Sequence, residues 1–206
     1  MSGAAAVLAR GMRDNPLHVR AFGEDLHRRG AALARIFEAL LHQYVSKGVI
    51  LGAFDSGTLV GVCGMVQPGR CQATTIEKLS LLPALLAGGG LRPTVRVVRW
   101  VSRWSRYDPK AAHWHLGPVA VDRHLQGKRV GSALLRQFCT RMDAEQSMAY
   151  LETDRAENVA FYERFGFEVT AQDEILGVPN WFMSRGAQVP KGPVCAAELM
   201  SNPHEA

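Results

Sequence analysis

The sequence predicts a single α/β domain of the α+β kind, in which amphipathic helices alternate with short strands. Its 206 residues are 47% hydrophobic and 21% charged, the composition of an ordinary globular chain. Apolar residues recur at helical spacing in some stretches and alternate with polar residues in others, and glycine or proline separates these stretches. A chain of this length can bury a substantial core without disulfides or structural metals.

The periodicity places the elements in order along the chain. Helices are expected at residues 4–13, 30–46, 76–87, 94–106, from Val130 onward, and at 158–164. Strands are expected at residues 49–54, 59–66, 113–121 and 148–153, followed by two final strands. The turn at residues 55–57 makes a hairpin of the first two strands, and the glycine run at 88–90 ends a helix. Residues 1–185 are expected to form the domain, and residues 186–206 a loosely ordered tail.

The strand at residues 113–121 has Gly117 and Pro118 in its middle. Proline has no backbone N–H to donate, so strand pairing is expected to break there. If the strand parts from its neighbour, the N–H and C=O groups of Val119, Ala120 and Val121 are left without partners. An extended ligand with amide groups would supply them. The pantetheine arm of coenzyme A, which has two amides, is such a ligand.

A basic, glycine-containing loop follows this strand and opens the helix from Val130. The first amides of a helix are unpaired and carry partial positive charge, so a phosphate is stabilised there. Lys128 and Arg129 add full charges at the same place. The expected cofactor contacts in this loop and helix start are Gln126, Gly127, Lys128, Arg129, Val130, Gly131 and Ser132. The sequence has neither a P-loop motif nor a dinucleotide-binding glycine fingerprint.

These segments resemble the GNAT superfamily of acetyl-CoA-dependent N-acyltransferases from about residue 48 to residue 184. The resemblance rests on L-G-P-V-A-V-D at 116–122, Q-G-K-R-V-G at 126–131, L-E-T-D at 151–154, N-V-A-F-Y-E-R-F-G-F at 158–167 and W-F-M at 181–183. It implies a mixed, mostly antiparallel sheet with a splayed central strand pair and helices on both faces. Acetyl-CoA is the co-substrate that it implies.

The chain departs from the family pattern in two places. Arg129 stands where the family usually has the first glycine of its Gly-x-Gly, and a side chain there is compatible with helical φ. The family's first strand normally precedes the first helix, but few residues stand before Ala4. That strand is absent, formed by another stretch such as residues 17–22, or lost to the assignment of the start site.

The resemblance also implies roles for individual residues. Tyr162 matches the family's tyrosine and is expected to protonate the departing thiolate. If the strand is split as proposed, the N–H of Val119 or of its neighbour is expected to hold the thioester oxygen. Asn158 is expected to cap its helix and contact the cofactor. Glu152, near the end of its strand, is the expected general base, with His115 on the neighbouring strand as the alternative.

The function that follows is direct transfer of an acetyl group from acetyl-CoA to a primary amine of a small molecule or protein. The alternative is a non-catalytic acyl-CoA-binding module. Five arginines, Arg92, Arg96, Arg99, Arg103 and Arg106, form one face of a helix, with Val97, Val101 and Trp104 expected to dock on the core. That arginine face would contact a partner or nucleic acid in the alternative, although one helix without a known reader module does not favour nucleic acid.

Other classes are disfavoured. The four cysteines are scattered with no C-x-x-C spacing, and His113, His115 and His124 have no second ligand cluster in the sequence, so no metal site is predicted. No apolar run approaches the about 20 residues of a membrane helix, and residues 4–9 do not form a signal peptide. A cytoplasmic protein is expected, and a homodimer is compatible with the sequence.

Overall fold

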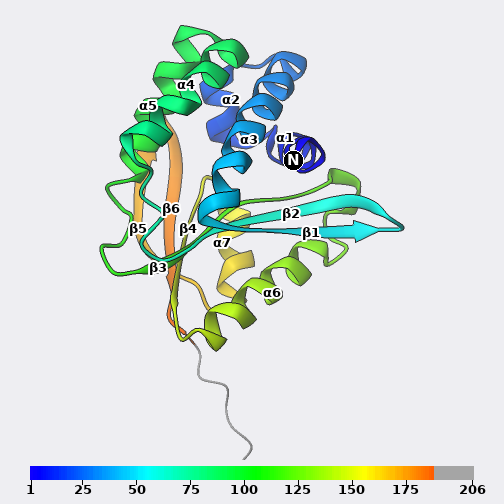
Figure 1. The fold of residues 1–206 in the computed structure, drawn as a ribbon, viewed down its shortest axis with the longest axis vertical. Helices are drawn as coiled ribbons and strands as arrows, with labels where there is room; N and C mark the ends of the chain where they lie inside the picture. The colour runs from blue at the N-terminus through cyan, green and yellow to red at the C-terminus, as the bar shows by residue number, and fades with distance from the viewer. Residues whose placement is uncertain (188–206) are drawn as a thin grey trace, which may run out of the picture.

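The computed structural model describes residues 1–187 of the chain. It contains a six-stranded sheet in the order β1-β2-β3-β4-β6-β5 (Figure 1). The strands are β1 (Gly48–Asp55), β2 (Thr58–Val66), β3 (His113–Val121), β4 (Met148–Thr153), β5 (Glu168–Ile175) and β6 (Val178–Arg185). Only β3 and β4 pair in parallel, and the other neighbours are antiparallel. The predicted mixed, mostly antiparallel sheet is confirmed.

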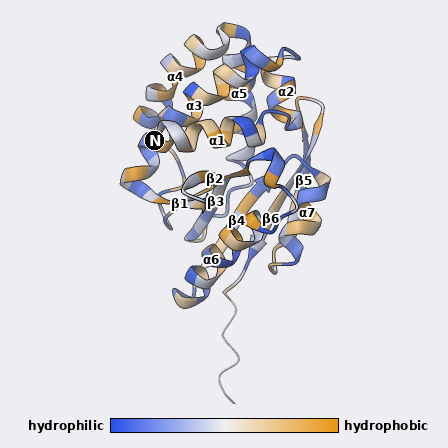
Figure 2. Ribbon diagram, turned by 90° about the vertical axis from the view of Figure 1, so that its right-hand side faces the viewer, coloured by the Kyte–Doolittle hydropathy of each residue, from blue (hydrophilic) through white to orange (hydrophobic). Residues whose placement is uncertain are grey.

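Helices cover both faces of the sheet (Figures 1 and 2). They are α1 (Ser2–Met12), α2 (Pro16–Phe22), α3 (Leu26–Lys47), α4 (Thr75–Gly89), α5 (Leu91–Trp104), α6 (Val130–Ala144) and α7 (Ala156–Glu163), with a short 3-10 turn at Arg123–Leu125. The first five helices lie on one side, and α6 and α7 on the other. None of the described helices is long and apolar enough to cross a membrane.

The core consists of three clusters of buried residues that follow the two faces of the sheet. One side of α6 packs against β2, β3 and β4, as the helical spacing of its apolar residues predicts. The buried residues on this side are Leu134, Leu135, Phe138 and Met142. On the opposite face, α1 and α3 pack over the middle of β2, while α2 and α5 pack over β4 and β6. Burial of these stripes positions both the start of α6 and the end of β3.

The structure excludes one of the alternatives given for the family's first strand. Residues 17–22, considered as a stand-in for the family's first strand, lie in α2, where Pro16 occupies the first turn and fixes a helical φ. Its buried side chains, Leu17, His18 and Ala21, pack on the helical layer and the sheet. The described residues therefore contain no strand before β1, so the sheet begins with the hairpin.

The arginine-rich helix α5 docks in part as predicted, because Val97 and Trp104 pack against buried residues of the core. Val101 is exposed, whereas Trp100 is buried and packs edge-on against Trp104, 5.0 Å between ring centroids. Two of the arginines serve the fold, since Arg103 forms an ion pair with Asp173 and Arg96 donates to the carbonyl of Arg20.

The tail predicted for residues 186–206 lies outside the described residues from position 188 onward.

The ends of several helices follow local capping chemistry. Asp25 caps α3, and Thr74 and Glu77 form a reciprocal capping box at the start of α4. The glycine run closes α4, with Gly90 at a φ of +74° as its cap, as predicted.

Candidate active site

Strands β3 and β4 part in the middle of the sheet. They pair only from His113 to His115 on β3, against residues 148–150 on β4. Beyond this point β4 continues to pair with β6 on its other side, and β3 continues to pair with β2. The β2–β3 register shifts at the position of Gly117 and Pro118. The predicted splay of the central strand pair is therefore confirmed.

The parted edge of β3 presents backbone groups toward β4. The Asp122 N–H donates to the Val60 carbonyl on β2, 2.8 Å away. Because backbone groups alternate along an antiparallel ladder, those of Ala120 also face β2, and those of Val119 and Val121 face the other way. Ala120 was expected to present free groups and does not. The Val121 carbonyl accepts a hydrogen bond from Gln126 Nε2 at 3.1 Å, which leaves the Val121 N–H and both groups of Val119 at the gap.

The basic loop leads directly into α6. Among the described residues, the amides of Gly127 and of residues 129–132 have no hydrogen-bond acceptor, and no side chain caps the helix. The first helical bond is donated by Ala133 to the Arg129 carbonyl, at 3.0 Å. Lys128 and Arg129 are exposed at this helix start. A cluster of free amides with two cations beside it is a site for an anion.

Arg129 does not adopt the helical φ that was expected for it. Its φ is +67° and its ψ is 3°, in the left-handed region. This conformation is unfavourable for a residue with a Cβ, which explains why a glycine suits the position. A surface hollow of about 200 Å³ lies next to the loop, lined by Gln126, Arg155, Arg123 and residues of α1 and its end. Asp14 also lines this hollow, and its arginines Arg10, Arg123 and Arg155 form ion pairs with Asp122, Asp14 and Glu157.

Tyr162 lies in α7 and is 8% exposed. Its ring packs against Phe161 and Phe167, with centroids 5.3 and 5.9 Å away. Burial, with a smaller contribution from the nearby Cys63 thiol, raises the pKa of the Tyr162 hydroxyl above its ordinary value. This group therefore keeps its proton at neutral and moderately alkaline pH.

Asn158 is not the cap of α7. The helix begins at Ala156, and Asn158 lies in its first turn, where its Nδ2 donates to Thr153 Oγ1 at 3.2 Å. The cap position is held by Arg155, whose side chain does not cap the helix. Asn158 thus ties α7 to the end of β4, next to the parted strands.

The two base candidates from the sequence are partners. His115 Nε2 lies 2.8 Å from Glu152 Oε2, across the point where β3 and β4 separate. The Glu152 side chain is only 6% exposed. Burial alone would lower the pKa of His115, but the charge of Glu152 and neighbouring groups outweigh burial and raise it to about 10. The pair therefore forms a buried, charge-assisted hydrogen bond.

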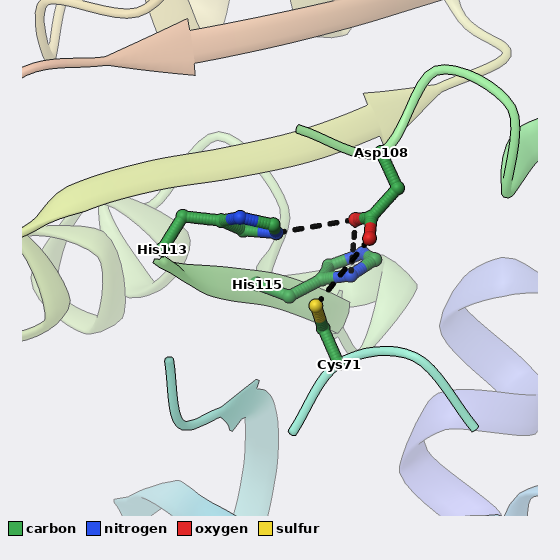
Figure 3. A group of neighbouring side chains, drawn as sticks. All are labelled: Cys71, Asp108, His113 and His115. Atoms are coloured by element: carbon green, nitrogen blue, oxygen red, sulfur yellow. Dashed lines mark hydrogen bonds and ion pairs between the residues drawn. The ribbon is translucent and has the colours of Figure 1, made fainter. Parts of the chain in front are cut away.

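On its other side, His115 lies beside three further side chains, those of Cys71, Asp108 and His113. The sequence did not predict that these residues meet. Cys71, from the segment after β2, and Asp108, from the segment after α5, meet His113 and His115 of β3 (Figure 3). Burial by itself would lower the pKa of His113. The hydrogen bond to Asp108 and other neighbouring groups outweigh burial and raise this pKa to about 10. The expectation that no other potential ligands accompany these histidines is wrong, because the partners come from distant parts of the chain.

The mixed sheet with one parted strand pair, and an uncapped basic helix start beside the gap, define the acetyltransferase class of fold. Residues 17–167 match the Acetyltransferase (GNAT) family, and the chain belongs to this family. Membership implies acyltransferase activity. The resemblance drawn from the sequence motifs is thereby confirmed.

Solved structures agree with this assignment. A structure described as histone acetyltransferase HPA2 and related acetyltransferase from Corynebacterium glutamicum is 26% identical, covers 91% of each chain and gives a TM-score of 0.68. The PaiA N-acetyltransferase from Thermoplasma acidophilum, solved in complex with coenzyme A, is 12% identical and covers 89% of this chain and 91% of its own. Its TM-score of 0.51 shows likeness of fold alone.

Proposed function

We propose that this protein transfers the acetyl group of acetyl-CoA directly to a primary amine of a small molecule or protein. The observation that carries the proposal is the parting of β3 from β4 beside the start of α6. One strand edge with free amide groups and one helix start with free amide donors are placed within reach of a single extended ligand. Coenzyme A has amides along its arm and a pyrophosphate at the end of that arm.

In the proposed complex, the pantetheine arm lies along the gap and pairs with the backbone of Val119 and Val121. The pyrophosphate is held by the amides of Gly127 and of residues 129–132, which include Val130, Gly131 and Ser132. Gln126, Lys128 and Arg129 support the phosphates, and Asn158 lines the gap from the side of α7.

The proposed chemistry is a single transfer without an acyl-enzyme. The amine nitrogen attacks the thioester carbonyl carbon, and the Val119 N–H stabilises the oxygen as negative charge develops on it. The carbon–sulfur bond then breaks, and Tyr162 donates its proton to the departing thiolate. The Tyr162 hydroxyl is protonated at neutral pH and therefore has a proton to donate when the carbon–sulfur bond breaks. Glu152 accepts the proton that the amine loses, directly or through water.

The experiment uses the purified full chain with acetyl-CoA and a panel of polyamines, amino acids, aminoglycosides, arylamines and peptide N-termini. Release of free coenzyme A thiol is measured, and products are identified by mass spectrometry. We expect amine-dependent thiol release with one acetylated product per thiol. Binding of coenzyme A without transfer to any amine would favour the alternative binding module. In that case, binding of a nucleic acid by the α5 arginines would fall steeply with added salt.

A further inference from the structure

The cluster beside the gap contains four side chains of types that bind metal ions. One potential ligand atom from each of Cys71, Asp108, His113 and His115 lies within 4.8 Å of all the others. His113 Nε2 is 3.1 Å from Asp108 Oδ1, and His115 Nδ1 is 3.9 Å from the same oxygen. Cys71 Sγ is 3.4 Å from Asp108 Oδ2. Figure 3 shows the four side chains converging from two segments and β3.

The spacing of these atoms fits a small tetrahedral ion. Zinc binds nitrogen and oxygen at about 2.0–2.2 Å and sulfur at about 2.3 Å, which places its ligands roughly 3.3–3.8 Å from one another. The separations quoted above involve both oxygens of Asp108, and all four ligand atoms lie within 4.8 Å of one another, so side-chain rotations would bring them to bonding distance of one ion. His113 and His115 are two residues apart on one strand, so their side chains project from the same face of β3.

The surroundings hold each ring with one nitrogen toward the cluster. His113 Nδ1 is 2.7 Å from the Ala111 carbonyl, which leaves Nε2 toward the cluster. His115 Nε2 is bonded to Glu152, which leaves Nδ1 toward the cluster. Histidines that bind metals commonly bond their other nitrogen to a carbonyl or carboxylate in this way.

The remaining contacts restrain the cluster further. Gln72 Nε2 donates to Asp108, and the Tyr150 ring meets both imidazoles edge-on, with centroids 5.5 and 5.4 Å away. An ion-pair network of two carboxylates and two imidazoles explains the histidines and acids. The Cys71 thiol joins this network through its 3.4 Å hydrogen bond to Asp108 Oδ2, and one metal ion bound by all four groups also accounts for their convergence.

We propose that Cys71, Asp108, His113 and His115 bind one zinc ion. Two imidazoles, a thiolate and a carboxylate are the donors that favour zinc among common divalent ions, and four protein ligands make a closed structural site. The ion ties the segments around Cys71 and Asp108 to β3 next to the gap. The proposal is independent of acetyl transfer.

The test measures metal binding rather than turnover. The full chain is stripped with a chelator, and zinc content after reconstitution and dialysis is measured by mass spectrometry. Cobalt(II) is then titrated into the stripped protein. We expect one zinc per chain, intense visible bands of tetrahedral cobalt and a near-ultraviolet thiolate-to-cobalt band. Retention of no zinc, or a weak octahedral cobalt spectrum, would overturn the proposal.

Variants locate the site. Cys71→Ser should abolish the thiolate-to-cobalt band, and His113→Ala should weaken zinc binding at least about tenfold. Two control variants should bind zinc as the parent does: His42→Ala, at an exposed position, and Cys139→Ala, whose thiol lies on the buried side of α6. If His113→Ala fails to fold, Asp108→Asn replaces it. Unchanged binding and spectrum in Cys71→Ser would contradict the assignment, as would loss of the thiolate band in Cys139→Ala.

Discussion

His115 on β3 and Glu152 on β4 are joined by a 2.8 Å hydrogen bond at the point where their strands separate. His115 is the last residue of β3 paired with β4, and Glu152 lies just beyond the last paired residue of β4. The bond therefore closes one end of the gap in which we place the pantetheine arm. The same pair connects the proposed base to the proposed zinc site.

Replacing Tyr162 with phenylalanine should separate chemistry from binding. Loss of the proton donor is expected to lower kcat about 100-fold, while the dissociation constant for acetyl-CoA changes less than about twofold. Steady-state kinetics and calorimetry measure the two quantities. Tyr107→Phe is the matched control, because that ring stacks on Phe182 outside the gap. Equal turnover in Tyr162→Phe and the parent would remove this hydroxyl from the mechanism.

Arg129→Gly should stabilise the protein. The substitution relieves a left-handed φ of +67° and is expected to add about 1 kcal/mol to the free energy of unfolding, or about 2–4 °C in Tm. Arg129→Ala removes the same charge but keeps the Cβ, so it should give no such gain. Calorimetric melting of the three proteins makes the comparison. Equal gains in both variants would show that charge, rather than backbone conformation, is responsible.

Gly64→Ala should disturb the bulge that accompanies the gap. A Cβ at this position would lie 3.0 Å from the Gly117 carbonyl oxygen, Pro118 Cδ and Tyr44 Cε2. Such overpacking is expected to cost about 1–3 kcal/mol and to weaken coenzyme A binding by moving β3. Denaturant unfolding and calorimetry test this. Gly186→Ala, at an exposed position outside the helices and strands with open space around its Cβ, should leave both unchanged. A fully stable Gly64→Ala protein with parental affinity would contradict this prediction.

The ion pair between Asp122 and Arg10 predicts an acid-sensitive contribution to stability. Two hydrogen bonds of 2.8 Å from Arg10 lower the pKa of Asp122, against the opposing effect of burial. A lowered folded-state pKa stabilises the protein above the unfolded pKa of about 3.9, and this stability is lost as pH falls through the folded value.

Asp122→Asn should therefore cost about 1 kcal/mol at pH 7, a figure that allows for the exposure of Arg10. The difference from the parent should shrink below about pH 4. Denaturant unfolding at a series of pH values measures it, with the exposed Asp55→Asn as the control. A difference that stays constant down to pH 2 would argue against the ion pair.

The sequence predicted the parts of the site that lie in continuous segments. Gly117 and Pro118 indicated the broken pairing, and the loop before Val130 indicated an uncapped basic helix start, because each signal is local. The direction of the Ala120 backbone groups depended on the β2 register, which periodicity does not supply. The left-handed Arg129 was missed because a loop φ is set by the turn as a whole.

The proposed zinc ligands were missed for a different reason. Cys71 and Asp108 are brought to His113 and His115 by the packing of two connecting segments, and nothing in their spacing along the chain predicts that meeting. The helix at residues 17–22 was likewise decided by its neighbours. Pro16 begins it, and the Leu17 N–H is bonded to Asp154 Oδ2 at 2.8 Å, far along the chain.

The central claim is that coenzyme A occupies the gap between β3 and β4 with its pyrophosphate at the start of α6. Amide hydrogen exchange, measured by NMR with and without coenzyme A, tests it most directly. We predict new protection at the Val121 and Val119 amides and at Gly127 and residues 129–132, with Ala120 unchanged. Binding that leaves these amides unprotected, or the absence of any binding, would contradict the account.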